Sequence, residues 1–300
     1  MAHAIGSDAS YYDSMMAAVP GANAKRLYAQ KLNGDGSAHM PASWPAGAGS
    51  LDIYSIYPNL NDVVSGALDA QLDELCASAP PNAALALYHE MNVPGMGYTT
   101  GSPEYLYPGN YHKACRRVKE IANGHGVLLG IIGTGPVSSW STWIPSTGSN
   151  SDQLPAGFDW YGQDTYQTYH VSTADGAPSL SAWTSYLMNP LLNLAKSQTG
   201  WAHPRIYIPE TGSNFGCQGG GSSAGFGSYY AGEWHYCTRN RPQWHNMVAH
   251  WLRGNCTGSR MCIFWSDGRG PTTSLNGPWS SVTKPDIDML QSIVSTAPEN

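Results

Sequence analysis

Ala83-Ala-Leu-Ala-Leu-Tyr-His-Glu-Met-Asn92 is a short apolar run that ends in polar residues. Its leucines, separated by small residues, predict a strand that is buried on both faces, as a parallel sheet between helices requires. His89, Glu90 and Asn92 follow at the carboxyl end of that strand. Because α/β folds bind their ligands at this edge of the sheet, we expect the functional site there.

A second apolar run, Arg205-Ile-Tyr-Ile-Pro-Glu210-Thr-Gly-Ser213, also stops at a carboxylate. In an α/β barrel the carboxyl ends of all strands meet at one mouth. If both runs are strands of one barrel, Glu90 and Glu210 point into the same mouth. The sequence therefore predicts a pair of carboxylates from strands that lie far apart in the chain.

The chain of 300 residues alternates strand-like and helix-like segments, and no linker or shift in composition divides it. This length suits one barrel of the (β/α)8 TIM type, which takes about 250 residues and accepts insertions. We therefore predict the α/β class and a single (β/α)8 domain over residues 1–300. The expected strands lie within residues 4–8, 25–29, 50–57, 83–92, 127–132, 158–166, 205–213 and 261–265. The expected helices lie within residues 10–20, 62–75, 111–122, 180–195, 243–252 and 284–295.

The composition favours a sugar as the partner and argues against nucleic acid and membrane. Charged residues make up only 12% of the chain, whereas it has 34 Gly, 11 Trp and 18 Tyr, so its surface is largely uncharged and aromatic. The net charge of −6, without any run of Lys or Arg, gives no electrostatic footprint for nucleic acid or an anionic lipid surface. No apolar run approaches the eighteen residues of a membrane span. We expect a monomer that binds a polysaccharide or an oligosaccharide.

The six cysteines form an even set that three disulfides could use up, or they could be free buried thiols. We favour disulfides and hence a secreted protein, although no signal peptide is visible in this sequence. Proximity in the sequence or in the expected fold suggests three pairs. They are Cys76 with Cys115, Cys217 with Cys237, and Cys256 with Cys262.

Glycoside hydrolysis needs two carboxyl groups that flank one bond. The motifs His89-Glu90-Met91-Asn92 and Glu210-Thr211-Gly212-Ser213 resemble those of clan A, the retaining (β/α)8 glycosidases with catalytic glutamates on strands four and seven. Within this clan the pair most resembles glycoside hydrolase family 26, best known for endo-β-1,4-mannanases. The resemblance implies that Glu90 is the general acid/base and Glu210 the nucleophile. It places His89 beside the acid/base, where it shapes the site and contacts the substrate.

Other residues match the same pattern. In the run Gly162-x-Asp164-x-Tyr166, Tyr166 matches the tyrosine that hydrogen-bonds the nucleophile in the family. By the same resemblance, Trp265 would form a platform under the sugar. Asp164 is expected to orient Tyr166 or bind sugar, and Asn92 to hold the sugar 2-OH. Three further tryptophans near strand ends are expected to stack on sugar rings. They are Trp140, Trp143 and Trp279.

Several alternatives remain open. Val93-Pro-Gly-Met-Gly-Tyr98 follows Asn92 where family 26 mannanases usually have a Trp-rich segment, so mixed-linkage β-glucan, β-1,3-xylan or arabinan could be the substrate. A retaining glycosidase of another family is a second alternative, and a carbohydrate-binding barrel without catalysis is a third. Glu90 could also be a structural carboxylate paired with Arg26. His89-Glu90 begins the zinc motif H-E-x-x-H, but position 93 is Val, so we expect neither a metal nor a cofactor.

Overall fold

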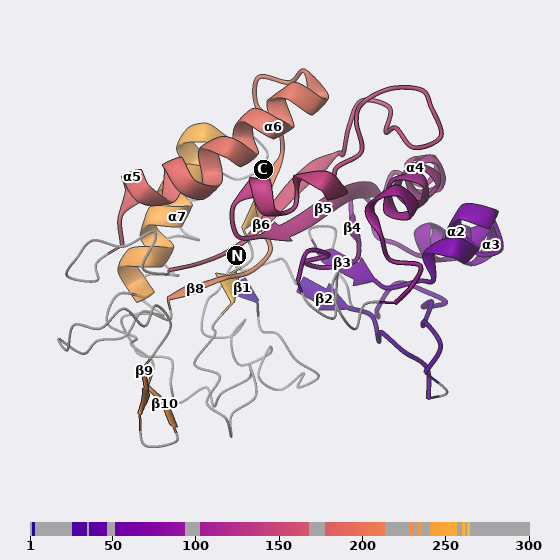
Figure 1. The fold of residues 1–300 in the computed structure, drawn as a ribbon, viewed down its shortest axis with the longest axis horizontal. Coiled ribbons are helices and arrows are strands. Elements are labelled where there is room, and N and C mark those ends of the chain that lie inside the picture. Colours follow the sequence, from indigo (N-terminus) through magenta and orange to yellow (C-terminus); the bar gives the residue numbers. More distant parts are fainter. Residues whose placement is uncertain are drawn as a thin grey trace.

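The computed structural model describes residues 2–3, 26–34, 36–46, 52–93, 103–167, 178–213, 228–230, 233–235, 241–256, 260–261 and 263–264. Within these residues a curled parallel sheet is flanked by helices on its outside (Figure 1). Helices α2, α3 and α4 lie at one end of the sheet, and α5, α6 and α7 lie at the other. None of the helices in this part of the chain is both long and apolar enough for a membrane span.

The strands follow one another across the sheet in chain order, as expected of an α/β barrel. The main path runs β11-β7-β6-β5-β4-β3-β2, and every pairing along it is parallel. Its strands are β2 (Arg26–Tyr28), β3 (Ile53–Ile56), β4 (Ala84–Leu87), β5 (Leu128–Thr134), β6 (Trp160–Gln167), β7 (Ile206–Ile208) and β11 (Arg260–Met261). Strand β8 (Thr211–Ser213) follows β7 and pairs with β6.

The expected eighth strand is present as two short strands, β11 and β12 (Ile263–Phe264). They pair with strands from different parts of the chain. β11 pairs with β7, while β12 pairs in parallel with β1 (Ala2–His3). The first strand thus lies beside the last, which is the neighbour relation of a barrel. A pairing of β1 with β2, which would complete the ring, is not among those of the described residues. The short antiparallel pair β9 (Ser228–Tyr230) and β10 (Glu233–His235) stands apart from this sheet.

The single helix expected over residues 62–75 is wrong, because the structure has two helices there. α2 (Leu60–Ser65) ends at Gly66, which has a φ of 86° and caps the helix in the left-handed conformation. Glycine adopts this conformation at little cost, so it stops the helix although the apolar period continues beyond it. α3 (Asp69–Ala77) then starts a new helix. The segment between β2 and β3 contains no helix among its described residues, 31–34 and 36–46.

The other helices begin or end where their caps dictate. α4 (Pro108–Gly124) starts before the expected residue 111 because Pro108 suits the first helical turn. The helix expected over residues 180–195 is α5 (Leu180–Trp183), the π-helical η4 (Thr184–Met188) and α6 (Asn189–Thr199) in succession. Pro190 lies in the first turn of α6, where its missing N–H is tolerated directly after the π segment. α7 (Arg241–Asn255) extends the helix expected at 243–252, and the 3-10 turns η1 (Val137–Ser139) and η2 (Ser141–Trp143) follow β5.

The sheet separates two apolar layers. Residues of one face, including Ala84 and Ala86, form a small inner cluster, whereas Leu85 and Leu87 pack outward into the large cluster beneath the helices. This alternation is the period of two of a strand. Trp160 fills much of the inner layer and stacks on Tyr207, with ring centroids 4.8 Å apart. Trp160 therefore packs the interior of the sheet.

Gly130 on β5 leaves the room that the Trp160 ring occupies. A Cβ atom at Gly130 would lie 2.1 Å from the ring, much closer than atoms can approach. Overpacking a well-filled core costs about 1–3 kcal/mol. We expect Gly130→Ala to lower the free energy of unfolding by about that amount, measured by urea denaturation. Gly124→Ala is the matched control because a Cβ atom there meets nothing within 4 Å; an equal loss in both variants would contradict this account.

The suggested disulfide between Cys76 and Cys115 is not formed. Both are buried free thiols, one on α3 and one on α4, where they pack as small apolar side chains. Burial raises the pKa of Cys76 to about 12, which keeps this thiol protonated. The other two suggested pairs involve Cys217, Cys237 and Cys262, which lie outside the described residues. The strand expected at residues 4–8 and the helices expected at 10–20 and 284–295 also lie outside them.

Candidate active site

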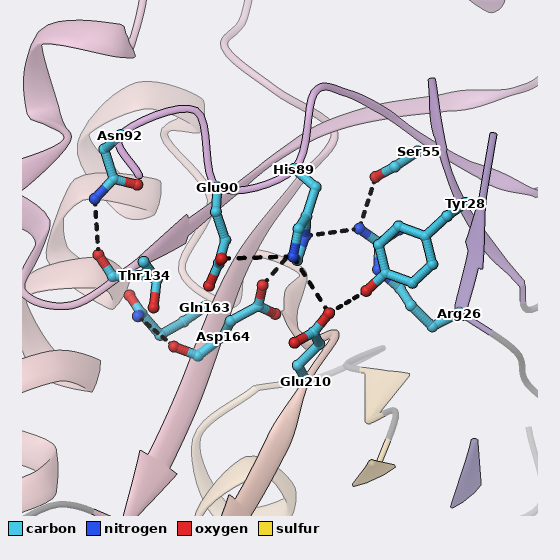
Figure 2. Close-up of polar contacts among 10 residues, drawn as sticks. All are labelled: Arg26, Tyr28, Ser55, His89, Glu90, Asn92, Thr134, Gln163, Asp164 and Glu210. Atoms are coloured by element: carbon cyan, nitrogen blue, oxygen red, sulfur yellow. Dashed lines mark hydrogen bonds and ion pairs between the residues drawn. The ribbon is translucent and has the colours of Figure 1, made fainter. Parts of the chain in front are cut away.

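Polar side chains from four strands converge at the carboxyl edge of the sheet (Figure 2). Arg26 and Tyr28 come from β2, Asp164 comes from β6, and Glu210 follows β7. His89 and Glu90 follow β4, and their side chains point toward Asp164 and Glu210. The predicted meeting of Glu90 and Glu210 at one edge of the sheet is therefore observed.

The backbone after β4 takes an unusual path that aims His89 and Glu90 into the site. Tyr88 and Glu90 have φ angles of 61° and 49°, in the left-handed region that residues other than glycine seldom adopt. The Tyr88 hydroxyl donates to the Pro58 carbonyl at 2.9 Å, and Val93 N donates to the Glu90 carbonyl at 2.8 Å. These bonds hold the turn at either end. Such conformations cost energy and tend to occur at functional sites.

His89 is the central contact of the cluster. Its Nε2 lies 3.2 Å from Oε1 of Glu210 and 3.7 Å from Oε2 of Glu90. Since both distances end on one nitrogen, the two carboxylate oxygens are at most 6.9 Å apart, the sum of these distances. Two carboxyl groups must lie about 5–5.5 Å apart for retaining and about 6.5–9.5 Å apart for inverting glycoside hydrolysis. The glutamates are thus close enough to act on one bond.

Arg26 determines which nitrogen of His89 carries the proton. Its Nη2 donates to Nδ1 of His89 at 3.0 Å and to Oγ of Ser55 at 2.6 Å. A guanidinium can only donate, so Nδ1 must accept and the proton of the neutral ring sits on Nε2. Burial, with the positive charges of Arg26 and Lys31, holds the pKa of His89 well below its usual range. His89 is therefore a neutral donor that faces Glu210.

Tyr28 is a residue of this cluster that sequence reasoning missed. Its hydroxyl donates a short hydrogen bond to Oε1 of Glu210, and the Arg26 guanidinium lies 4.5 Å from the centre of its ring. Burial and the Glu210 charge raise the pKa of Tyr28 well above its usual range, so the hydroxyl keeps its proton. The signal in the sequence is the alternation Arg26-Leu-Tyr28, which places two polar side chains on one face of a buried strand.

Asp164 is a buried carboxyl group beside the pair. Its Oδ2 lies 3.3 Å from Nδ1 of His89, and its side chain is fully buried. Desolvation, reinforced by the charges of Glu210 and Glu90, raises its pKa well above the usual range despite the opposing effect of Arg26. This shift favours the protonated, neutral form of Asp164.

A metal ion does not suit this cluster as it stands. His89, Glu90 and Asp164 each bring one possible ligand atom within 4.8 Å of the others. However, Nδ1 of His89 already accepts from Arg26 and Nε2 carries the proton, so the ring offers no lone pair. The positive charge beside the carboxyl groups is supplied by the Arg26 guanidinium. The expectation that the site needs no metal stays a prediction.

The pH dependence of stability tests the neutral state of Asp164. An acid whose pKa is raised by folding contributes stability below its unfolded pKa of about 4, and this contribution is lost as the pH rises toward its folded pKa. We expect Asp164→Asn, which stays neutral, to gain stability over the parent by up to about 1.4 kcal/mol per pH unit in that window. Thermal unfolding of both proteins at pH 5 to 8 measures this difference.

The exposed Asp152→Asn is the matched control for this series. Its difference from the parent should not change with pH in the same window. A pH-independent difference for Asp164→Asn would show that Asp164 is ionised in the folded protein.

The remaining predicted site residues lie in different surroundings. Nδ2 of Asn92 donates to the Thr134 carbonyl at 3.1 Å, so this amide holds the turn after β4 against β5; its contact with sugar stays a prediction. Trp140 and Trp143 were expected to stack on sugar, but the structure buries both rings. Trp140 fills the space over Gly133, and Trp143 packs edge-on against Tyr111 of α4 at 5.6 Å. Neither ring offers an exposed face.

Three further predictions have no side-chain description to test them. Tyr166 belongs to β6, but only its backbone is described. Trp265 and Trp279 lie outside the described residues.

Two indole groups hold the strand ends that carry Asp164 and Glu210. Trp183 of α5 donates from Nε1 to Oγ1 of Thr165 at 2.9 Å, and Trp244 of α7 donates in the same way to Thr211 at 2.7 Å. Each threonine directly follows one of the two carboxyl residues. The outer helices are thus bonded to the strands next to the site.

No protein-family model and no curated protein sequence matches this chain. Among solved structures, a β-glucosidase without ligand is similar with a TM-score of 0.52 at 10% identity, over 96% of this chain and 89% of that one. Cel5A of Thermotoga maritima in complex with cellobiose gives 0.50 at 10% identity, over 95% and 90%. An endoglucanase of Ruminococcus champanellensis with bound cellotriose gives 0.50 at 9% identity, over 96% and 86%. Together with the parallel sheet, these likenesses show an α/β fold of the barrel type.

Proposed function

We propose that this chain is a retaining glycoside hydrolase that cleaves β-linked polysaccharide. The observation that carries the proposal is the meeting of Glu90 and Glu210 on the two sides of His89 Nε2. Two carboxyl groups within reach of one bond are what double displacement requires. The likeness to solved glycosidase structures supports it, since Cel5A and the Ruminococcus endoglucanase were solved with cellobiose and cellotriose.

The reaction has two steps. Glu210 acts first as the nucleophile and then as the leaving group, and Glu90 acts first as the acid and then as the base. In the first step Glu210 attacks the anomeric carbon while Glu90 gives its proton to the glycosidic oxygen, which leaves with the departing sugar. In the second step Glu90, now ionised, takes a proton from water, and the resulting hydroxide displaces Glu210 from the sugar. Two inversions leave the configuration unchanged. Glu90 is the more exposed of the two, with 19% of its side chain accessible against 8% for Glu210.

The hydrogen-bond donors around Glu210 hold its carboxyl group in place. His89 and Tyr28 both direct a proton to Oε1 of Glu210, which limits rotation of the carboxylate. Its backbone carbonyl accepts from Thr165 N at 2.9 Å, which ties the residue to β6. The bond from Tyr28 to Glu210 is of the kind that the family resemblance assigned to Tyr166, whose contact with Glu210 stays a prediction. A fixed nucleophile loses less entropy on the way to the transition state.

The finer features of the proposal rest on the sequence. The motifs at Glu90 and Glu210 favour endo-β-1,4-mannanase activity. The domain would be a single closed eight-stranded barrel, and the protein would be secreted and monomeric. The glucan-derived ligands of the similar structures favour β-1,4-glucan as the second candidate substrate. Mixed-linkage β-glucan and β-1,3-xylan complete the panel to be tested.

Removal of either carboxylate should abolish cleavage of polymer. We expect Glu90→Ala and Glu210→Ala to lower reducing-sugar release from the preferred polymer by about 10²- to 10⁴-fold or more. An aryl glycoside with a good leaving group separates the two roles, because its departure needs no proton. Glu90→Ala should still release a burst of the aryl group, whereas Glu210→Ala should release none.

The configuration of the product is a further readout. Proton NMR of the parent reaction should show the β-anomer first. Initial appearance of the α-anomer would contradict retention, and binding of oligosaccharide without cleavage of any polymer would favour the non-catalytic barrel.

The bond from Tyr28 to Glu210 gives a separate prediction. Hydrogen bonds to charged groups contribute about 1.5–3 kcal/mol, so we expect Tyr28→Phe to lower kcat/KM by about 10- to 100-fold. Tyr54→Phe is the matched control, because Tyr54 is a buried tyrosine of the neighbouring β3 that packs on Trp44. Unchanged kinetics in Tyr28→Phe would remove Tyr28 from the nucleophile's environment.

A further inference from the structure

A polar cavity lies on the same side of the sheet as the carboxylates. It has a volume of about 330 Å³ and is formed by the loop after β2 together with the first turns of α2 and α3. Figure 1 shows this loop passing beside α2 and α3. Its lining includes Asn33, His39, Met40, Asp62, Leu68 and Gln71.

The chain connects this cavity directly to the site. The loop leaves β2 at Tyr28, the partner of Glu210, and reaches Lys31, whose pKa is lowered by partial burial and partly restored by the Glu90 charge. Lys31 Nζ lies 5.3 Å from the centre of the Tyr57 ring, directly after β3. Asn33 is two residues further, so its Cα lies within about 7 Å of that of Lys31. The loop that lines the cavity therefore starts at the carboxylate site.

The loop is held in one shape by its own hydrogen bonds. Asn33 N donates to the Ser37 carbonyl at 2.8 Å, and His39 N donates to the Lys31 carbonyl at 3.1 Å. The Asn33 amide donates to Ser37 and to the Ala38 carbonyl, so its Oδ1 accepts from Nδ1 of His39 at 2.8 Å. This leaves Nε2 of the neutral His39 ring as an acceptor. The cavity thus has a fixed wall with a defined hydrogen-bonding character.

The remaining wall combines polar groups with apolar surface. Asp62 and Gln71 supply a carboxylate and an amide from two helices, and Met40 and Leu68 supply aliphatic surface. Planar amides and carboxylates pair with vicinal hydroxyls, and aliphatic groups cover the C–H face of a pyranose. No Lys or Arg is among the described lining residues, so nothing there compensates a negatively charged ligand. A pocket of this size with few converging polar groups is typical of a small-ligand site.

We propose that this cavity binds an uncharged sugar unit of the polysaccharide, away from the bond that is cut. The inference rests on the proposed function, since it takes the chain held at Glu90 and Glu210 to continue along the loop after β2. The cavity then selects neutral glycans over those that carry uronic acids. It also makes affinity depend on the length of the oligosaccharide.

Binding to the full chain carrying Glu210→Ala tests the proposal without turnover. Isothermal titration would use mannohexaose, cellohexaose and their disaccharides. In that background we expect Gln71→Ala and Asp62→Ala each to weaken hexaose binding by about three- to tenfold, the effect of one lost hydrogen bond, and to leave disaccharide binding unchanged. Gln71 is exposed on α3, where alanine is well tolerated, so this variant keeps the fold even if Asp62→Ala weakens the start of α2.

Glu74→Ala is the matched control, since Glu74 is an exposed residue of α3 that does not line the cavity. Equal hexaose affinity in all variants, an equal loss in Glu74→Ala, or tighter binding of hexagalacturonate than of both neutral hexaoses would overturn the proposal. Failure of the proposed function would look different. The chain with Glu210 intact would then cleave no polymer, while the variants would still show whether the cavity binds the hexaoses.

Discussion

The hydrogen bond from Arg26 to Nδ1 of His89 determines the character of the whole site. It fixes the ring tautomer, so that a neutral imidazole presents an N–H to Glu210. The same guanidinium opposes the rise in the Asp164 pKa and lies over the Tyr28 ring. One permanent positive charge in the interior thereby offsets negative charge on the carboxyl groups around it.

The fold makes this arrangement possible by bringing strands together that are distant in the sequence. The polar side chains come from β2, β4, β6 and β7, and each is placed at the carboxyl edge by parallel pairing. Below this edge, the inner layer is filled by Trp160 stacked on Tyr207. A packed interior gives the polar groups a rigid base, and site geometry is more exact on strands than on loops.

Sequence reasoning found the strands and the glutamate pair because both leave local signals. Apolar runs that end in carboxylates predict strand ends, and the alternation of elements predicts parallel pairing. Tyr28 was missed because the alternation Arg26-Leu-Tyr28 is too short to be distinctive until the partner of Tyr28 across the sheet is known. Trp140 was misplaced for a similar reason. Only the space over Gly133, a contact between residues of β5 and the following turn, shows that its ring packs inward.

The pairing of each carboxyl residue with a tryptophan-bonded threonine has a consequence for protein engineering. Thr165 follows Asp164 and Thr211 follows Glu210, and their indole partners Trp183 and Trp244 contact each other edge-on, with ring centroids 5.8 Å apart. The positions of the outer helices therefore help to set the distance between the two strand ends. Substitutions that shift α5 or α7 would change this distance, although they lie outside the sheet. Redesign of the helix surface can therefore affect the site.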